Sequence, residues 1–267
     1  MRAAAIRAGC LAGAVCMGAI ATAAETAAPQ TVAIGAEDDA APWSYADGSG
    51  YVNDLVSAAF REVGWTVQLK VIPYTRCKAL VQAGTLAGCF SASKTPELQA
   101  ALLYPKHPVF LAQNLLIARA ESAWSGCDAA GWGARPLIGL VRGYEYVAAV
   151  DALAKDGRVK VDYAVSEVSN LRKIRAERIA AAVVTVDEVK RIDYVARLAH
   201  VPGDFKVVCD FGSLPAYVAF SRRHPQGAGA LAAFEEGYER LGRRGAIAAL
   251  QATWRARALD AAAVKQH

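Results

Sequence analysis

The feature that most constrains the fold is an alternation of short apolar strands with helices of about ten residues or more. In the first half, strand patterns in residues 31–39, 65–73 and 86–93 alternate with helical spacing in residues 51–64 and 75–84. Helices of this length between strands favour a parallel sheet with helices on its faces. We therefore predict an α/β fold.

The same alternation occurs a second time, after an extended run at residues 108–119. Strand and helix patterns follow one another in residues 134–143, 144–157, 159–165, 166–179, 180–189 and 190–200. A further extended run at residues 215–225 leads to two closing helices. No Pro/Ser-rich linker separates the two units, which indicates two α/β lobes joined by two extended crossings.

The N-terminal stretch has the pattern of a cleaved secretory signal peptide. Arg2 and Arg7 precede an uncharged apolar run, and residues 21–23 form a small-residue exit of the A-x-A type. The alternative is a membrane anchor, but the run is short for a membrane span and rich in Ala and Gly. We assign residues 1–24 to the signal peptide and predict an exported, periplasmic protein.

The charge balance of the chain argues against a nucleic-acid-binding surface. The sequence has 30 basic and 25 acidic residues, and removal of Arg2 and Arg7 leaves a net charge of +3. The remaining basic clusters are short and scattered, as on solvated helix ends. The length of the mature chain suffices for one large domain or for two lobes of roughly 100–120 residues.

The cysteines that remain after cleavage predict disulfides. An even number in an oxidising compartment suggests two bridges, with three possible connectivities. Cys77 and Cys89 flank a short loop between a helix and the next strand, so their ends are close, and this pairing leaves Cys127 with Cys209. A zinc site is the rival interpretation, but the chain has no C-x-x-C motif and its histidines are scattered.

Residues 90–98, FSASKTPEL, place Ser91, Ser93 and Thr95 on alternate positions at a strand end. Hydroxyls with this spacing face the same side of an extended segment. They could hold a small polar ligand, whereas Lys94 would point to the opposite side. The segment does not show which residue would supply the counter-charge to a charged ligand.

Six phrases of the sequence occur in the order and at the spacing of a known family. They are APWSYADGSGYVNDLVSAAFREVG, VIPYTRCKALVQAG, FSASKTPEL, IGLVRGYEY, NLRKIRAERIAAAVV and GAIAALQATW. The chain resembles the bacterial extracellular solute-binding proteins of family 3, from about Thr31 to Trp254. The resemblance implies a type II periplasmic binding protein with two lobes, one of residues 25–115 and 217–267, the other of residues 116–216. It also implies closure about hinge strands near residues 112–119 and 213–220.

Several positions depart from the family pattern. The arginine that grips the ligand's α-carboxylate in amino-acid receptors of this family corresponds here to Leu98. The aspartate that takes the α-ammonium corresponds to Thr185 in a gapless comparison, with Asp187 two residues later, and a frequent stacking tyrosine corresponds to Ala40. Leucine cannot replace the arginine, and an unpaired buried carboxylate is costly.

Other residues could supply charge and aromatic surface to the cleft. Ligands of open α/β sheets bind beyond the carboxyl ends of strands, where the Gly143 turn falls. Arg76 and Arg142 are the candidate cations, and Glu145 is a candidate anion. The aromatic residues predicted to border the cleft suit a flat, cyclic or cationic solute; they are Trp43, Tyr45, Tyr74, Tyr144 and Tyr146.

We therefore expect a non-catalytic, monomeric receptor for a small polar solute, an amino acid or a related compound, without cofactor or metal. Its partner would be an ABC permease or a membrane sensor. One alternative is a periplasmic enzyme of the same fold, such as a cyclohexadienyl dehydratase, although no catalytic motif is present. Another is a sensory or accessory module that does not bind free amino acids.

Overall fold

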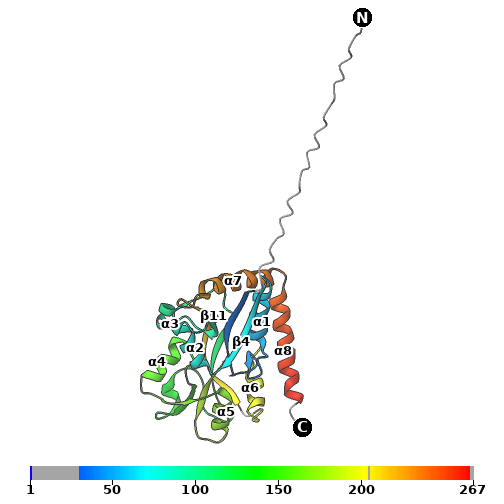
Figure 1. Ribbon diagram of the computed structural model, residues 1–267. Helices are drawn as coiled ribbons and strands as arrows, with labels where there is room; N and C mark the ends of the chain where they lie inside the picture. The colour runs from blue at the N-terminus through cyan, green and yellow to red at the C-terminus, as the bar shows by residue number, and fades with distance from the viewer. Residues whose placement is uncertain (2–29, 204, 265–267) are drawn as a thin grey trace.

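The computed structural model describes residue 1, residues 30–203 and residues 205–264 (Figure 1). The predicted signal peptide, residues 1–24, lies outside these residues except for Met1. One mixed sheet runs through the protein in the strand order β4-β1-β5-β11-β7-β10-β8-β9, with the short β6 paired to β11. The structure confirms the predicted α/β class.

The first half of the sheet is built as the sequence pattern predicts. Strand β1 pairs in parallel with β4 and β5. Because these strands are parallel, their carboxyl ends lie at one edge of the sheet. The strands and the helices that connect them are β1 (Gln30–Glu37), α1 (Tyr51–Arg61), β4 (Trp65–Ile72), α2 (Tyr74–Ala83) and β5 (Gly88–Ala92).

The second half repeats this arrangement. Strand β8 lies between β9 and β10 and is parallel to both. Helix α5 begins after Ser166, whose hydroxyl accepts a hydrogen bond from the Ser169 N–H. The elements are β8 (Leu137–Val141), α4 (Ala148–Lys155), β9 (Lys160–Ala164), α5 (Glu167–Arg175), β10 (Ala181–Val186) and α6 (Ile192–Leu198).

Two long antiparallel strands join the halves. Strand β7 (Phe110–Arg119) pairs with β11 (Phe205–Ser221). Strand β7 also pairs with β10 of the second half, and the end of β11 pairs with β5 of the first half, so the two strands together connect the halves of the sheet. The predicted hinge segments lie within these two strands. The predicted lobe boundaries at 115/116 and 216/217 also fall inside them and stay a prediction.

Short elements that the sequence pattern did not indicate fill the connections. They are β2 (Asp39–Ala40), β3 (Ser44–Tyr45), α3 (Pro96–Ala101), β6 (Leu102–Leu103) and the 3₁₀ turn η1 (Ala129–Trp132). Helix α3 begins at Pro96 because proline is favourable at the first position of a helix and the Thr95 hydroxyl caps it.

The closing helices α7 (Gly227–Arg243) and α8 (Ala246–Val264) confirm the sequence pattern of the C-terminal region. Helix α7 packs on α1, and α8 runs beside α1 and reaches α6 of the second half (Figure 1). Within the described part of the chain, no helix is long and apolar enough to cross a membrane.

Both predicted disulfides are present with the predicted pairing. Cys77–Cys89 ties the start of α2 to β5, with Cα atoms 6.1 Å apart. Cys127–Cys209 ties the loop before η1 to β11 across 82 residues of sequence. The buried Cys77 and Cys89 belong to an apolar cluster with Leu98, so the first bridge packs in the interior of the first half.

The crossing of α7 over α1 gives a testable prediction. A methyl group at Gly237 of α7 would lie 1.8 Å from the Ala59 carbonyl oxygen of α1, whereas one at Gly229 would meet only Trp65 at 3.8 Å. We expect Gly237→Ala to lower the free energy of unfolding by about 1–3 kcal/mol. Gly229→Ala, on the exposed side of the same helix, should raise it by about 0.5 kcal/mol. Urea denaturation measures both, and equal effects would contradict the close packing.

Candidate functional site

A small cavity lies between the two halves, at the carboxyl ends of the strands. Its volume is about 30 Å³, room for roughly two water molecules. The first half, the hinge strands and the second half all contribute to its wall. The lining residues are Glu37, Trp43, Tyr74, Ser91, Ser93, Phe110, Ala112, Tyr144, Glu145, Thr185 and Ala216.

Glu37 is the acidic centre of the cavity wall. It is the last residue of β1, and only 7% of its surface is exposed. The hydroxyl of Tyr144, from the turn after β8, donates a hydrogen bond of 2.8 Å to Glu37 Oε1. Burial raises the pKa of Glu37 to about 7, against the opposing effects of the Tyr144 hydrogen bond and the Lys190 charge.

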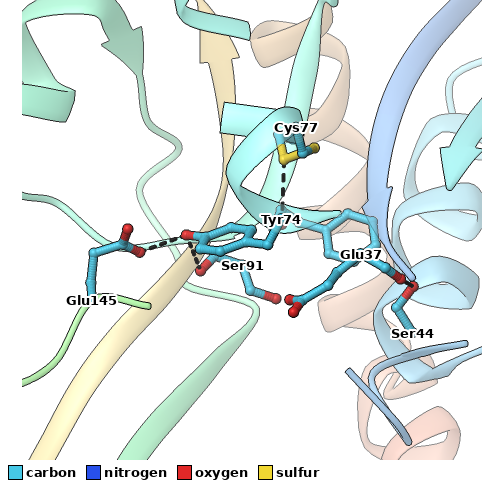
Figure 2. Close-up of a disulfide and its surroundings, with 8 residues drawn as sticks. Glu37, Ser44, Tyr74, Cys77, Ser91 and Glu145 are labelled. Atoms are coloured by element: carbon cyan, nitrogen blue, oxygen red, sulfur yellow. Dashed lines mark hydrogen bonds between the residues drawn. A yellow bond between two sulfur atoms is a disulfide. The ribbon is translucent and has the colours of Figure 1, made fainter. Parts of the chain in front are cut away.

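A second group of contacts joins α2 to the turn after β8. The Tyr74 hydroxyl donates a hydrogen bond of 2.5 Å to Glu145 Oε2 (Figure 2). The Lys78 ammonium forms an ion pair with Glu145 and donates to the Gly143 carbonyl at 2.6 Å. Lys78 also lies 4.4 Å from the centre of the Tyr74 ring. These contacts hold the two halves together beside the cavity.

A third group surrounds Trp43. Its indole N–H donates to Asp187 Oδ2 at 2.9 Å, which joins the turn before β3 to the end of β10. One ring face stacks on Phe110 with centroids 4.2 Å apart, and the Lys190 ammonium lies 4.1 Å from the ring centre. Lys190 is itself paired with the buried Glu167. Burial raises the pKa of Asp187, which the Trp43 hydrogen bond opposes.

Some residues of the FSASKTPEL segment line the cavity, and others stabilise the first half of the protein. Ser91 and Ser93 line the cavity, as predicted, and Ser91 Oγ is buried without a hydrogen-bond partner. The Thr95 hydroxyl instead accepts a hydrogen bond from the Leu98 N–H and caps α3. Leu98 packs in the apolar cluster beside Cys77. Its side chain therefore belongs to the core of the first half.

The structure brings together only some of the other predicted site residues. Trp43, Tyr74, Tyr144 and Thr185 line the cavity. Asp187 and Tyr45 lie outside it but join the halves, Tyr45 through a 2.6 Å hydrogen bond to the Tyr194 hydroxyl.

The remaining predicted residues do not line the cavity. Gly143 supplies its carbonyl to Lys78, and the Tyr146 hydroxyl oxygen accepts a hydrogen bond from the Val141 N–H. The predicted cations Arg76 and Arg142 are exposed and do not reach the cavity wall. The candidate counter-charges are therefore carboxylates rather than guanidinium groups.

Sequence reasoning missed several residues of the site. Glu37 begins an acidic run at the end of the first predicted strand, residues 31–39, and was not singled out as a site residue. Lys78 follows Tyr74 by four positions in α2 and so shares its helix face. Both positions carry a signal in the sequence, but pairing them with residues 144 and 145 requires the packing of the two halves. Lys190 and Phe110 carry no comparable signal.

The chemistry of the site is that of an acidic, aromatic cleft. No residue that lines the cavity is cationic. Among the described residues, no group of three or more His, Cys, Asp and Glu side chains is arranged to hold a metal ion. The volume of about 30 Å³ is far below the roughly 300 Å³ or more typical of small-molecule sites. Side-chain contacts join the halves beside this cavity, which as it stands holds only a few atoms.

No protein-family model and no curated protein matches the chain. Solved structures match it over most of its length. A histidine kinase sensor domain with similarity to periplasmic binding proteins superposes with a TM-score of 0.71 at 19% identity, covering 85% of this chain and 96% of that one.

Two further structures are amino-acid-binding proteins. An amino acid ABC transporter substrate-binding protein from Streptococcus pneumoniae, bound to L-arginine, has a TM-score of 0.68 at 16% identity and covers 85% of this chain and 95% of its own. An ancestral amino-acid-binding protein, a precursor of cyclohexadienyl dehydratase, has a TM-score of 0.67 at 16% identity, with 84% and 94% covered. The chain has the fold of the periplasmic binding proteins, as the sequence resemblance implied.

The buried Glu37 predicts a pH dependence of stability. Its pKa of about 7 exceeds the ordinary value of 4.5, so the folded state holds a proton that the unfolded state releases between these values. The free energy of unfolding should therefore fall as the pH rises through this window. Relative to Glu37→Gln, the wild type should lose about 2–3 kcal/mol between pH 5 and pH 8.

Denaturant titrations at several pH values measure this difference. Glu239→Gln, an exposed position of α7, is the matched control and should keep the wild-type pH dependence. A Glu37→Gln variant whose stability follows the wild type at every pH would contradict the raised pKa.

Proposed function

We propose that this protein is a periplasmic solute receptor that captures a small polar solute between its two α/β lobes and closes over it. The observation that carries the proposal is the position of the cavity. It lies at the carboxyl ends of parallel strands from both halves, beside two strands that can act as a hinge. Contacts across the cavity come from side chains, which can separate and reform as the lobes move.

Binding without catalysis accounts for the site best. Glu37, with a pKa near neutrality, could act as a general acid, and one structural neighbour is a precursor of a dehydratase. Elimination from a cyclic carboxylate also needs a cationic clamp, however. Arg76 and Arg142, the candidates for that clamp, are exposed outside the cavity. We therefore propose a receptor rather than an enzyme.

The proposed partners follow from this role. The closed form would present a composite surface of both lobes to a membrane protein, either an ABC permease or a sensor. One neighbour is a transporter component and another is a kinase sensor domain. Export through cleavage of residues 1–24 would place the monomeric receptor in the periplasm.

Thermal unfolding against a panel of amino acids, amines, sugars and cyclic acids tests the proposed function. A solute at one hundred times its dissociation constant adds about 2.7 kcal/mol to the stability of the folded state. For a chain of this size we expect the melting temperature to rise by about 5 °C or more with a cognate solute. A panel without any shift would contradict a receptor role.

Closure itself is tested at Gly143, which has a φ of +81° and faces Thr75 of α2. A side chain there begins 2.4 Å from the Thr75 methyl carbon, so Gly143→Asn should wedge the lobes apart. Gly157→Asn is the matched control, because its φ is +77° and no atom lies within 4 Å of an added Cβ.

Both variants carry a backbone strain of about 1 kcal/mol, which asparagine tolerates better than most residues. Small-angle X-ray scattering should show a larger radius of gyration for Gly143→Asn than for Gly157→Asn. The thermal shift produced by any solute that binds the wild type should also be smaller in Gly143→Asn. Identical scattering and solute responses in the two variants would refute closure at this contact.

A further inference from the structure

Two carboxylates near the junction of the lobes, Glu145 and Glu167, share one arrangement with an ammonium ion and an aromatic ring. Glu145 accepts a hydrogen bond from Tyr74, and the Lys78 ammonium pairs with the carboxylate and lies over the ring. In the second case the Lys190 ammonium pairs with Glu167 and lies over Trp43. In both cases the chain provides its own ammonium ion for a site made of a carboxylate and an aromatic face.

Glu37 is the third carboxylate, and it has no ammonium ion of its own. Tyr144 donates to Oε1, but among the described residues no lysine or arginine forms an ion pair with Glu37. Lys190 acts on Glu37 only through its charge, because its ammonium is paired with Glu167. A nine-tenths buried carboxylate thus faces the cavity without a cation.

The neighbouring Ser91 hydroxyl has no hydrogen-bond partner. Ser91 Oγ lines the same cavity and is buried without a hydrogen bond. Figure 2 shows the side chains of Glu37 and Ser91 directed toward the same space. A hydroxyl oxygen and a carboxylate are both acceptors for N–H donors. Glu37 has a second carboxylate oxygen besides the Oε1 that binds Tyr144, so this oxygen and Ser91 Oγ suit one group with several N–H bonds.

We propose that the cleft binds an organic ammonium or guanidinium ion that lacks a carboxylate, with its cationic head between Glu37 and Ser91. This inference names the solute class of the receptor and rests on the proposed function. The cation would complete the third carboxylate–aromatic site as Lys78 and Lys190 complete the other two. The Tyr144 and Tyr74 rings, which meet edge to face with centroids 5.7 Å apart, border the head.

The absence of a carboxylate from the solute follows from the wall of the cavity. The lining includes Glu37 and Glu145 and no cation. Leu98 lies in the apolar core and Arg76 and Arg142 are exposed, so none of them faces a carboxylate in the cavity. The α-carboxylate of an amino acid would enter unpaired beside two acidic groups, which is strongly unfavourable.

The size of the cavity agrees with a cationic head as the buried part. A volume of about 30 Å³ accommodates a group of a few atoms. The remainder of a larger solute would extend along the junction of the lobes as they part.

Matched pairs of compounds test the solute class. Agmatine, cadaverine and tyramine differ from arginine, lysine and tyrosine in lacking the carboxylate, and all three amines stay protonated between pH 6 and pH 8. Isothermal titration calorimetry on the cleaved, oxidised protein measures the affinity for each compound. We expect at least one amine to bind, and to bind at least tenfold more tightly than its parent amino acid.

Glu37 variants locate the cation. Glu37→Gln keeps the shape and should weaken amine binding at least tenfold, because a hydrogen bond to a charged group is lost. The exposed Glu239→Gln control should bind as the wild type does. In the wild type the affinity should rise about tenfold from pH 6 to pH 8 as Glu37 ionises, whereas Glu37→Gln should show no such rise.

The outcomes separate the inference from the proposed function. Amino acids that bind as tightly as their amines, or an amine whose affinity is the same in Glu37→Gln, would overturn the solute class and leave the receptor role intact. A sugar or an acid as the solute in the thermal panel would likewise overturn the solute class and leave the receptor role intact. If no compound of the thermal panel and none of the matched pairs binds, both the solute class and the receptor role are wrong.

Discussion

The antiparallel pairing of β7 with β11 is the constraint on which the rest of the structure depends. These strands are the middle of the sheet, and each also pairs with a strand of one half. The pairing leaves the carboxyl ends of the outer parallel strands facing each other across the centre. Glu37 at the end of β1 and Tyr144 after β8 are 107 residues apart in sequence, yet they share a hydrogen bond.

Where the two halves meet, three carboxylates lie in or near the interior, and lysines of the chain pair with only two of them. Glu37, Glu145 and Glu167 lie near the region where the halves meet, and burial without a partner disfavours ionised carboxylates. Lys78 and Lys190 balance two of these carboxylates. The third keeps its proton near neutral pH or requires a cation from outside. In the proposed receptor, solute choice and closure are linked through this one residue.

The sequence predicted the architecture well because periodicity and turn residues are local signals. Strand and helix order, the serine cap of α5, the closing helices and both disulfides all follow from spacing along the chain. Helix α3 was missed because a proline such as Pro96 can either end a strand or stand at the first position of a helix.

The site was less predictable, since its chemistry arises between segments distant in sequence. Ser91, Ser93 and the aromatic residues Trp43, Tyr74 and Tyr144 were found from turn positions. Arg76 and Arg142 were chosen because a charged solute needs a counter-charge, and the sequence does not show that both point outward. Glu37 was hidden in a run of acidic residues, where only packing distinguishes the buried carboxylate from its less buried neighbours Asp38 and Asp39.

The ionisation of Glu37 in the solute-free protein is the most direct test of this account. Carbon-13 NMR of glutamate-labelled protein, with the Glu37→Gln variant to assign the signal, gives the pKa of its carboxyl group. We predict a midpoint near pH 7 in the free protein and a clear decrease when an organic cation is bound. A Glu37 carboxyl that titrates near its ordinary value of 4.5 in the free protein would contradict the unpaired buried acid at the centre of the cleft.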